Sequence, residues 1–210
     1  MENLEKHIAQ SLLQIKAIKL EPANYFTWAS GWKSPIYCDN RKTLSYPELR
    51  KTITSGFVEI IKSRFERPDA IAGVATGAIA IGALVAEALD LPFVYVRPKP
   101  KEHGLGNMIE GELKAGSTVV VIEDLISTGK SSLQAVEALR NAEINVIGMV
   151  AIFTYEFDHA MHNFANEKVT LHTLSNYHVL IETALETGYI KQSDMETLKH
   201  WRKKPETWNQ

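Results

Sequence analysis

Apolar positions recur in two different rhythms along the chain, and the first of them is helical. Residues 3–19 carry apolar side chains three or four positions apart, which predicts an amphipathic helix that Pro22 closes. The members of this stripe are Leu4, Ile8, Leu12, Ile15 and Ile18. A second helix is predicted from Tyr46-Pro47 to about Phe65, because proline is well suited to the first turn of a helix.

The segment 24–46 between these two helices has a different character. It is rich in aromatic residues and has turn residues at Ser30-Gly31 and Ser34-Pro35. Apolar residues interrupted by such turns predict a short β-hairpin or an extended flap.

After Pro68 the second rhythm begins, in which short β-branched runs alternate with helical segments. Strands are predicted at 70–74, 93–96, 118–122, 146–153 and 169–174, and helices at 79–89, 131–141, 177–187 and 193–203. Continuous apolar strands separated by helices are typical of a parallel sheet covered on both faces. The predicted fold class is therefore α/β, with an open, mostly parallel sheet flanked by helices and an N-terminal hood or flap.

One long stretch, 97–117, breaks the alternation. It lies between two predicted strands, and its sequence offers no plausible long helix. Loops of this length inside a compact domain usually serve as lids or binding loops. Clustered cations followed by glycines favour a mobile lid that binds an anion, and the alternative is an inert surface excursion.

Composition excludes several classes of protein. Of the 210 residues, 45% are hydrophobic and 23% are charged, which argues against a disordered or fibrous chain. A domain has about 100–200 residues, so we expect one domain over 1–210, to which 1–46 contribute the first helix and the flap. The formal net charge is −2. This offers no sequence-wide attraction to nucleic acids or anionic lipids, so we expect neither as a partner.

The single cysteine, Cys38, bears on where the protein works. It cannot form a disulfide within the chain, so a reducing cytoplasm is the expected location. The polar N-terminus is unlike a signal peptide, and no apolar run approaches the ~20 residues that span a bilayer.

The segment 119–131 carries the clearest chemical signal. A buried strand leads into two adjacent acids, Glu123-Asp124, then a turn at Ser127-Thr128-Gly129, then a helix. Ligands of open parallel sheets bind beyond the carboxyl ends of the strands, and helix N-termini bind phosphate. An acidic pair beside a phosphate cup indicates a phosphorylated sugar, whose hydroxyls would donate hydrogen bonds to the carboxylates.

Two other interpretations of this segment compete with a sugar-phosphate site. Gly129-Lys130-Ser131 is similar to the end of a P-loop, but that motif requires glycine where Asp124 stands. The purely structural alternative is that Ser127 or Thr128 caps the following helix, with the acids favouring its positive end. Capping is expected in addition, but alone it does not explain two acids at the end of an apolar strand.

The segment 119–131 resembles the phosphoribosyl pyrophosphate signature of the type I phosphoribosyltransferases. Three further segments are similar to the orotate phosphoribosyltransferases within that family, and the resemblance covers nearly the whole chain. These segments are the aromatic flap residues 26–35, the turn Gly73-Val74-Ala75-Thr76-Gly77, and the basic run from Arg97 to Gly104.

The resemblance implies a Mg²⁺-dependent transfer of ribose 5-phosphate from phosphoribosyl pyrophosphate to orotate, giving orotidine 5′-monophosphate and pyrophosphate in pyrimidine synthesis. It implies that Lys101, His103 and Asp124 are catalytic, that Ser127 also binds orotate, and that Mg²⁺ is bound through the substrate pyrophosphate without a direct protein ligand. The residues it assigns to phosphoribosyl pyrophosphate are Arg97, Lys101, His103, Glu123, Asp124, Leu125, Ile126, Ser127, Thr128, Gly129, Lys130 and Ser131.

Further expectations follow from the same resemblance. A homodimer is implied, with the basic loop of one chain closing over the site of its neighbour. Trp28 and Tyr37 are candidates for stacking on the base, with core packing the alternative for both. Two other functions stay open, a transferase for a purine base and a transcriptional regulator that senses phosphoribosyl pyrophosphate.

Overall fold

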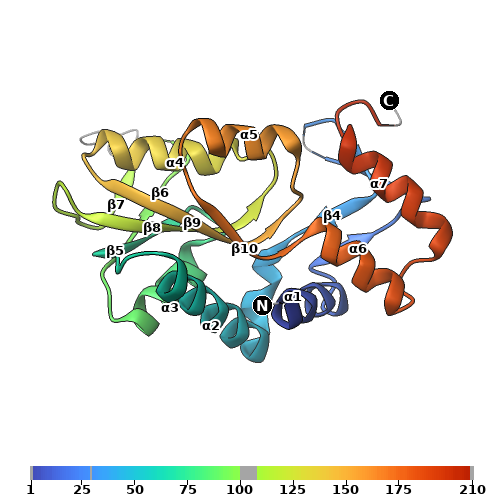
Figure 1. Cartoon of the computed structure of the whole chain (residues 1–210), viewed down its shortest axis with the longest axis horizontal. Helices are drawn as coiled ribbons and strands as arrows, with labels where there is room; N and C mark the ends of the chain where they lie inside the picture. The colour runs from blue at the N-terminus through green and yellow to red at the C-terminus, as the bar shows by residue number, and fades with distance from the viewer. Residues whose placement is uncertain (1, 29, 100–107, 209–210) are drawn as a thin grey trace.

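A six-stranded sheet forms the centre of the computed structural model, which describes residues 2–28, 30–99 and 108–208 (Figure 1). In spatial order its strands are β10 (Leu171–Asn176), β9 (Asn145–Thr154), β8 (Thr118–Ile126), β5 (Ala70–Val74), β6 (Phe93–Val96) and β7 (Ile109–Glu110). Neighbouring strands are parallel except β6 and β7, which are antiparallel. The predicted fold class, an open and mostly parallel α/β sheet flanked by helices, is confirmed.

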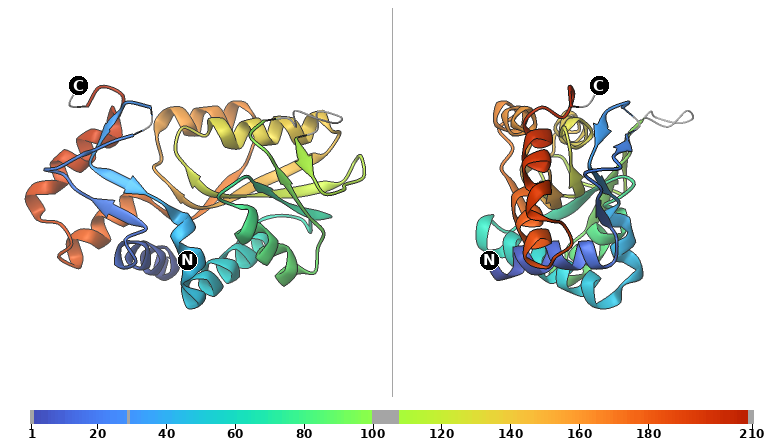
Figure 2. Two further views of the ribbon diagram at one scale, coloured as in Figure 1. Left: turned by 180° about the vertical axis from the view of Figure 1, so that it is seen from behind. Right: turned by 90° about the vertical axis from the view of Figure 1, so that its right-hand side faces the viewer.

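Helices cover both faces of this sheet (Figures 1 and 2). On one face lie α2 (Pro47–Arg64) and α3 (Ile79–Leu89), and on the other lie α4 (Lys130–Asn141) and α5 (Asp158–Asn166). Successive residues of β8 supply the two cores in turn. Val120 and Ile122 pack in the core on the α2 and α3 side, whereas Val119 and Val121 pack in the core beneath α4 and α5.

The N-terminal flap, residues 18–38, consists of two antiparallel pairs. Strand β1 (Ile18–Leu20) pairs with β4 (Ile36–Cys38), and β2 (Phe26–Thr27) pairs with β3 (Lys33–Ser34). The predicted hairpin or flap is therefore present. A short 3₁₀ helix, η1 (Asn40–Ser45), connects the flap to α2.

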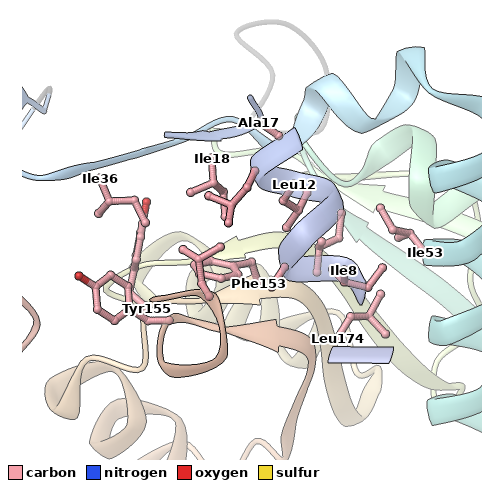
Figure 3. Packing of buried hydrophobic residues seen from close by; sticks show 14 of the residues in the cluster. Ile8, Leu12, Ala17, Ile18, Ile36, Ile53, Phe153, Tyr155 and Leu174 are labelled. Carbon is pink, nitrogen blue, oxygen red and sulfur yellow. The ribbon is translucent and has the colours of Figure 1, made fainter. Parts of the chain in front are cut away.

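Aromatic side chains hold the flap against the C-terminal helices α6 (Tyr177–Glu186) and α7 (Met195–Lys203). Trp201 of α7 donates from Nε1 to the backbone oxygen of Lys33 at 3.1 Å. The Trp28 ring lies 5.3 Å from the Tyr155 ring and 5.7 Å from the Trp201 ring. Figure 3 shows Tyr155 and Ile36 packed in the same core as α1 (Glu2–Gln14) and β9.

The first helix is shorter than its apolar stripe predicts. It ends at Gln14 rather than continuing to residue 19, because Lys16 adopts a left-handed conformation with φ of 56°. Ile18 then joins β1, where it faces Cys38 across the pair and is fully buried. The helical spacing of Ile18 therefore reflects burial in the same core from a different backbone conformation.

Several other boundaries differ from the prediction. Strand β8 continues to Ile126 instead of ending at residue 122, since its pairing with β9 extends through the acidic pair to Thr154. Strand β10 is shifted toward the C-terminus, to 171–176. Helix α5 was not predicted, because within it only Ala160 and Phe164 are buried. None of the helices in the described ranges is long and apolar enough to cross a bilayer.

Candidate active site

The two acids of segment 119–131 make different contacts, although they are adjacent. Glu123 is 4% exposed, and its carboxylate is already hydrogen-bonded. Its Oε1 accepts from the backbone N–H of Asp124 at 2.9 Å, and its Oε2 accepts from the hydroxyl of Ser132 at 2.8 Å. Glu123 therefore connects the end of β8 to the first turn of α4.

The environment of Glu123 disfavours its charged form. Burial raises the pKa of this carboxyl well above its ordinary value, and the neighbouring Asp124 carboxylate raises it further. The hydrogen bonds from Ser132 and from the Asp124 N–H act in the opposite direction and lower it. The arrangement thus keeps a proton on Glu123 more tightly than on a solvated glutamic acid.

Asp124 is half-buried and lies against the turn that follows β5. A methyl group added at Gly77 would overlap the Asp124 carboxylate, so the carboxylate could not keep its present position if residue 77 carried a side chain. The turn contains a cis peptide bond between Ala75 and Thr76. The structure therefore brings together the acid of one predicted motif and the turn of another.

The turn Ser127-Thr128-Gly129 leads directly into α4, as predicted. Gly129 occupies the N-cap position with φ of 77°, and an added Cβ there would lie 2.8 Å from Phe164 of α5. The expectation that Ser127 or Thr128 caps this helix is wrong, since α4 has no side-chain cap among the described residues. The N–H groups of its first turn therefore remain available to an anion.

A cavity of about 970 Å³ adjoins this turn. Trp32 of the flap and Thr128 of the turn contribute to its wall, together with Lys130 and further residues of α4 and with residues of α5. Lys130 and Ser131 are exposed, whereas Leu125 is half-buried and Ile126 is buried. Contacts from Leu125 and Ile126 to a ligand would therefore come from their backbone.

The basic run is only partly described. Arg97 follows β6, and its guanidinium lies 3.4 Å from the carboxylate of Glu110. Lys101 and His103 lie outside the described residues, so their predicted roles remain predictions.

The two aromatic candidates differ in their surroundings. Trp28 packs in the flap core and donates from Nε1 to the backbone oxygen of Ile36 at 3.0 Å, as the core alternative predicts. Tyr37 is 40% exposed and contacts the Phe26 ring at 5.7 Å. Tyr37 is therefore the better placed of the two to stack on a base.

Residues 38–41 enter the site, although the sequence assigned them no role beyond the flap. Asn40 is buried, and its Nδ2 donates to the backbone oxygen of Asp124 at 2.6 Å. The Cys38 thiol donates to Asn40 Oδ1 at 3.3 Å, and burial, with the charges of Asp124 and Asp39, raises its pKa well above the ordinary value. The signal in the sequence was the polar run Asp39-Asn40-Arg41 directly after the flap strand β4.

Comparisons with known proteins agree with this geometry. Residues 44–182 match the family model described as phosphoribosyl transferase domain. The chain is 62% identical to the orotate phosphoribosyltransferase of Bacteroides thetaiotaomicron over 209 residues, covering 100% of this chain and 99% of that protein. It is 52% identical to the orotate phosphoribosyltransferase of Lactococcus lactis over 206 residues, covering 98% and 99%. The crystal structure of orotate phosphoribosyltransferase from Aeropyrum pernix superimposes with a TM-score of 0.75 at 27% identity, covering 88% of this chain and 99% of that one.

Proposed function

The chain belongs to the phosphoribosyl transferase family, and within it to the orotate phosphoribosyltransferases, and from this membership we propose that it makes orotidine 5′-monophosphate. In this reaction the bond between C1 of the ribose and the pyrophosphate breaks, and a ring nitrogen of orotate bonds to C1. The observation that supports the proposal best is the position of the Asp124 carboxylate, against Gly77 and a few residues before the uncapped start of α4.

Each part of the site has a task in this reaction. The N–H groups and hydroxyls of 127–131 bind the 5′-phosphate at the positive end of α4. Asp124 accepts from a ribose hydroxyl and supplies negative charge close to the sugar, where positive charge develops as the C1–O bond breaks. Glu123 is proposed to bind the same sugar. In this structure its carboxylate also accepts from the backbone N–H of Asp124 and thereby fixes the position of Asp124.

The departing pyrophosphate requires positive charge. One cation about 4 Å away contributes on the order of 4 kcal/mol near a protein surface, which is too little for so charged a leaving group. We propose that Arg97, Lys101 and His103 share this task, with Lys101 and His103 catalytic. Closure of their loop would exclude water from the site.

The acids at the site fit Mg²⁺ carried by the substrate. Mg²⁺ usually retains several waters and is bound by substrate phosphates with one or two carboxylates. In the described ranges no three acidic, histidine or cysteine side chains form a metal cage, and we propose that Mg²⁺ is bound through the substrate pyrophosphate without a direct protein ligand. When bound, Mg²⁺ supplies positive charge to the leaving pyrophosphate. A cytoplasmic homodimer remains our expectation.

The test is an assay with orotate, phosphoribosyl pyrophosphate and Mg²⁺ that follows the loss of orotate absorbance and identifies the product by chromatography. Formation of orotidine 5′-monophosphate is expected, and its absence would reject the proposal. Adenine, guanine and hypoxanthine in the same assay test the purine alternative. A gel-shift assay with duplex DNA tests the regulator alternative, for which we expect no shift.

A further inference from the structure

An enzyme that selects a base with a carboxylate needs a donor or cation placed to bind that carboxylate. This inference rests on the proposed function. Orotate carries its carboxylate on the ring carbon next to the nitrogen that bonds to ribose. This carboxylate must therefore lie close to the sugar, between the residues that hold the ribose and those that cover the base. A group that recognises it must be a donor or cation between Asp124 and Tyr37.

Arg41 stands at this place. It follows Asn40 at the start of η1, and the Asn40 side chain is bonded to the Asp124 backbone oxygen at 2.6 Å. Tyr37, four residues earlier, presents a partly exposed ring at the end of the flap. A hydrogen bond to Asp39 raises the pKa of Arg41, and the negative charges of Asp39 and Asp124 favour its charged form further.

The Arg41 guanidinium has N–H groups beyond the one that binds Asp39. Asp39 Oδ1 accepts from its Nε at 2.7 Å, and the side chain is 61% exposed. Within the described ranges no other acceptor is recorded for it, which leaves both terminal amino groups for a ligand. These groups form a planar fork that matches the two oxygens of a carboxylate.

Three other cations among the described residues already make contacts of their own. Lys42 donates from Nζ to the backbone oxygen of Lys16 at 3.0 Å. Lys33 lies over the Tyr25 ring, 5.7 Å from its centroid. Arg97 lies beside Glu110.

We propose that Arg41 binds the carboxylate of orotate, and that Asp39 positions it by holding Nε. The pair would admit a pyrimidine with a carboxylate next to the reacting nitrogen and discriminate against uracil, which lacks it. Arg41 is then a specificity-determining residue of the base site and has no part in binding the sugar phosphate.

The experiment compares Arg41→Gln with Lys42→Gln, an adjacent cation of equal charge whose Nζ donates to the backbone oxygen of Lys16. We expect Arg41→Gln to raise KM for orotate about ten- to a hundredfold, the range of a charge-assisted pair. KM for phosphoribosyl pyrophosphate, and its Kd by calorimetry, should change less than about twofold. The ratio of kcat/KM for orotate over uracil should fall in Arg41→Gln and stay unchanged in Lys42→Gln.

The outcomes separate the possible errors. If KM for phosphoribosyl pyrophosphate rises while KM for orotate does not, Arg41 belongs to the pyrophosphate clamp and the proposal is wrong. A KM that is unchanged for both orotate and phosphoribosyl pyrophosphate also overturns the proposal. If Arg41→Gln does not fold, Arg41→Lys keeps the charge without the fork, and an orotate KM equal to wild type would contradict the proposal. Failure of the wild-type chain to form product refutes the proposed function instead.

Discussion

The Ser132 hydroxyl donates to Glu123 Oε2 at 2.8 Å, so the first turn of α4 is fastened to the strand that carries the acidic pair. Both residues are buried, with 1% and 4% of their surfaces exposed. The turn 127–129 is therefore held at both ends, by the strand before it and by this bond behind it. A turn fixed in this way keeps its backbone N–H groups in place before a ligand arrives, which an anion site requires.

The first prediction concerns Glu123→Gln and pH. Because burial raises the Glu123 pKa, the folded chain binds this proton more tightly than the unfolded chain. The stability that this proton contributes is present at acidic pH and is lost as the pH rises through the raised pKa. Glutamine does not titrate and can still accept from the Asp124 N–H and donate to Ser132. Urea unfolding from about pH 5 to 8 should therefore show Glu123→Gln gaining stability relative to wild type as the pH increases.

Glu137→Gln on the exposed face of α4 is the matched control, and its difference from wild type should stay constant. A Glu123→Gln difference that is flat or shrinks with rising pH would contradict the assigned pKa direction.

The second prediction concerns the Cys38 thiol. Burial and the nearby carboxylates of Asp124 and Asp39 raise its pKa, so little thiolate exists in the folded chain near pH 8. We expect a disulfide reagent to label folded Cys38 at least about tenfold more slowly than the urea-unfolded chain. Equal labelling rates, followed by thiol absorbance or mass, would show that the thiol is neither shielded nor raised in pKa.

The third prediction concerns Asn40→Ala. This change leaves the Asp124 backbone oxygen without its 2.6 Å partner and removes the acceptor of the Cys38 thiol. A buried acceptor without a partner costs about 1–3 kcal/mol, which urea unfolding can measure. Because the same bond ties η1 to the sugar-side acid, kcat/KM should fall as well. Asn24→Ala, at an exposed flap position, should change neither. A stable and fully active Asn40→Ala would show that the bond is dispensable.

Periodicity and turn residues were sufficient to predict the fold class, because parallel strands buried on both faces leave uninterrupted apolar runs such as 119–122. These patterns gave wrong or missing elements where the spacing of buried residues does not match the secondary structure. Ile18 fits a helical stripe yet lies in β1, and α5 buries too few side chains to produce a stripe. Strand β8 continues through Glu123 because backbone pairing with β9, which the sequence does not reveal, outweighs the polar side chain.

The site shows the same division. The order of acids, hydroxyls and glycine in 123–129 was enough to predict a sugar-phosphate site, which remains a prediction. The partners of these residues lie in distant segments of the sequence. Asn40, for example, binds the Asp124 backbone oxygen across 84 positions, and no local sequence pattern predicts such a contact. The different contacts of Glu123 and Asp124 could not be predicted from the sequence either, since both are acids at the end of one strand and only packing distinguishes them.

The last prediction separates catalysis from stability at Asp124. Replacing it with asparagine keeps the size of the side chain against Gly77 but removes the charge beside the sugar, so kcat/KM should fall about a hundredfold or more. Stability should be equal or higher, because the Asp124 carboxylate raises the pKa of buried Glu123 and its removal relieves that repulsion. Steady-state kinetics and urea unfolding near neutral pH test both parts on one preparation. Asp158→Asn, at the exposed start of α5, is the matched control and should leave kcat/KM unchanged. A parallel loss of activity and stability in Asp124→Asn would make Asp124 a structural acid and remove the charge argument for its role.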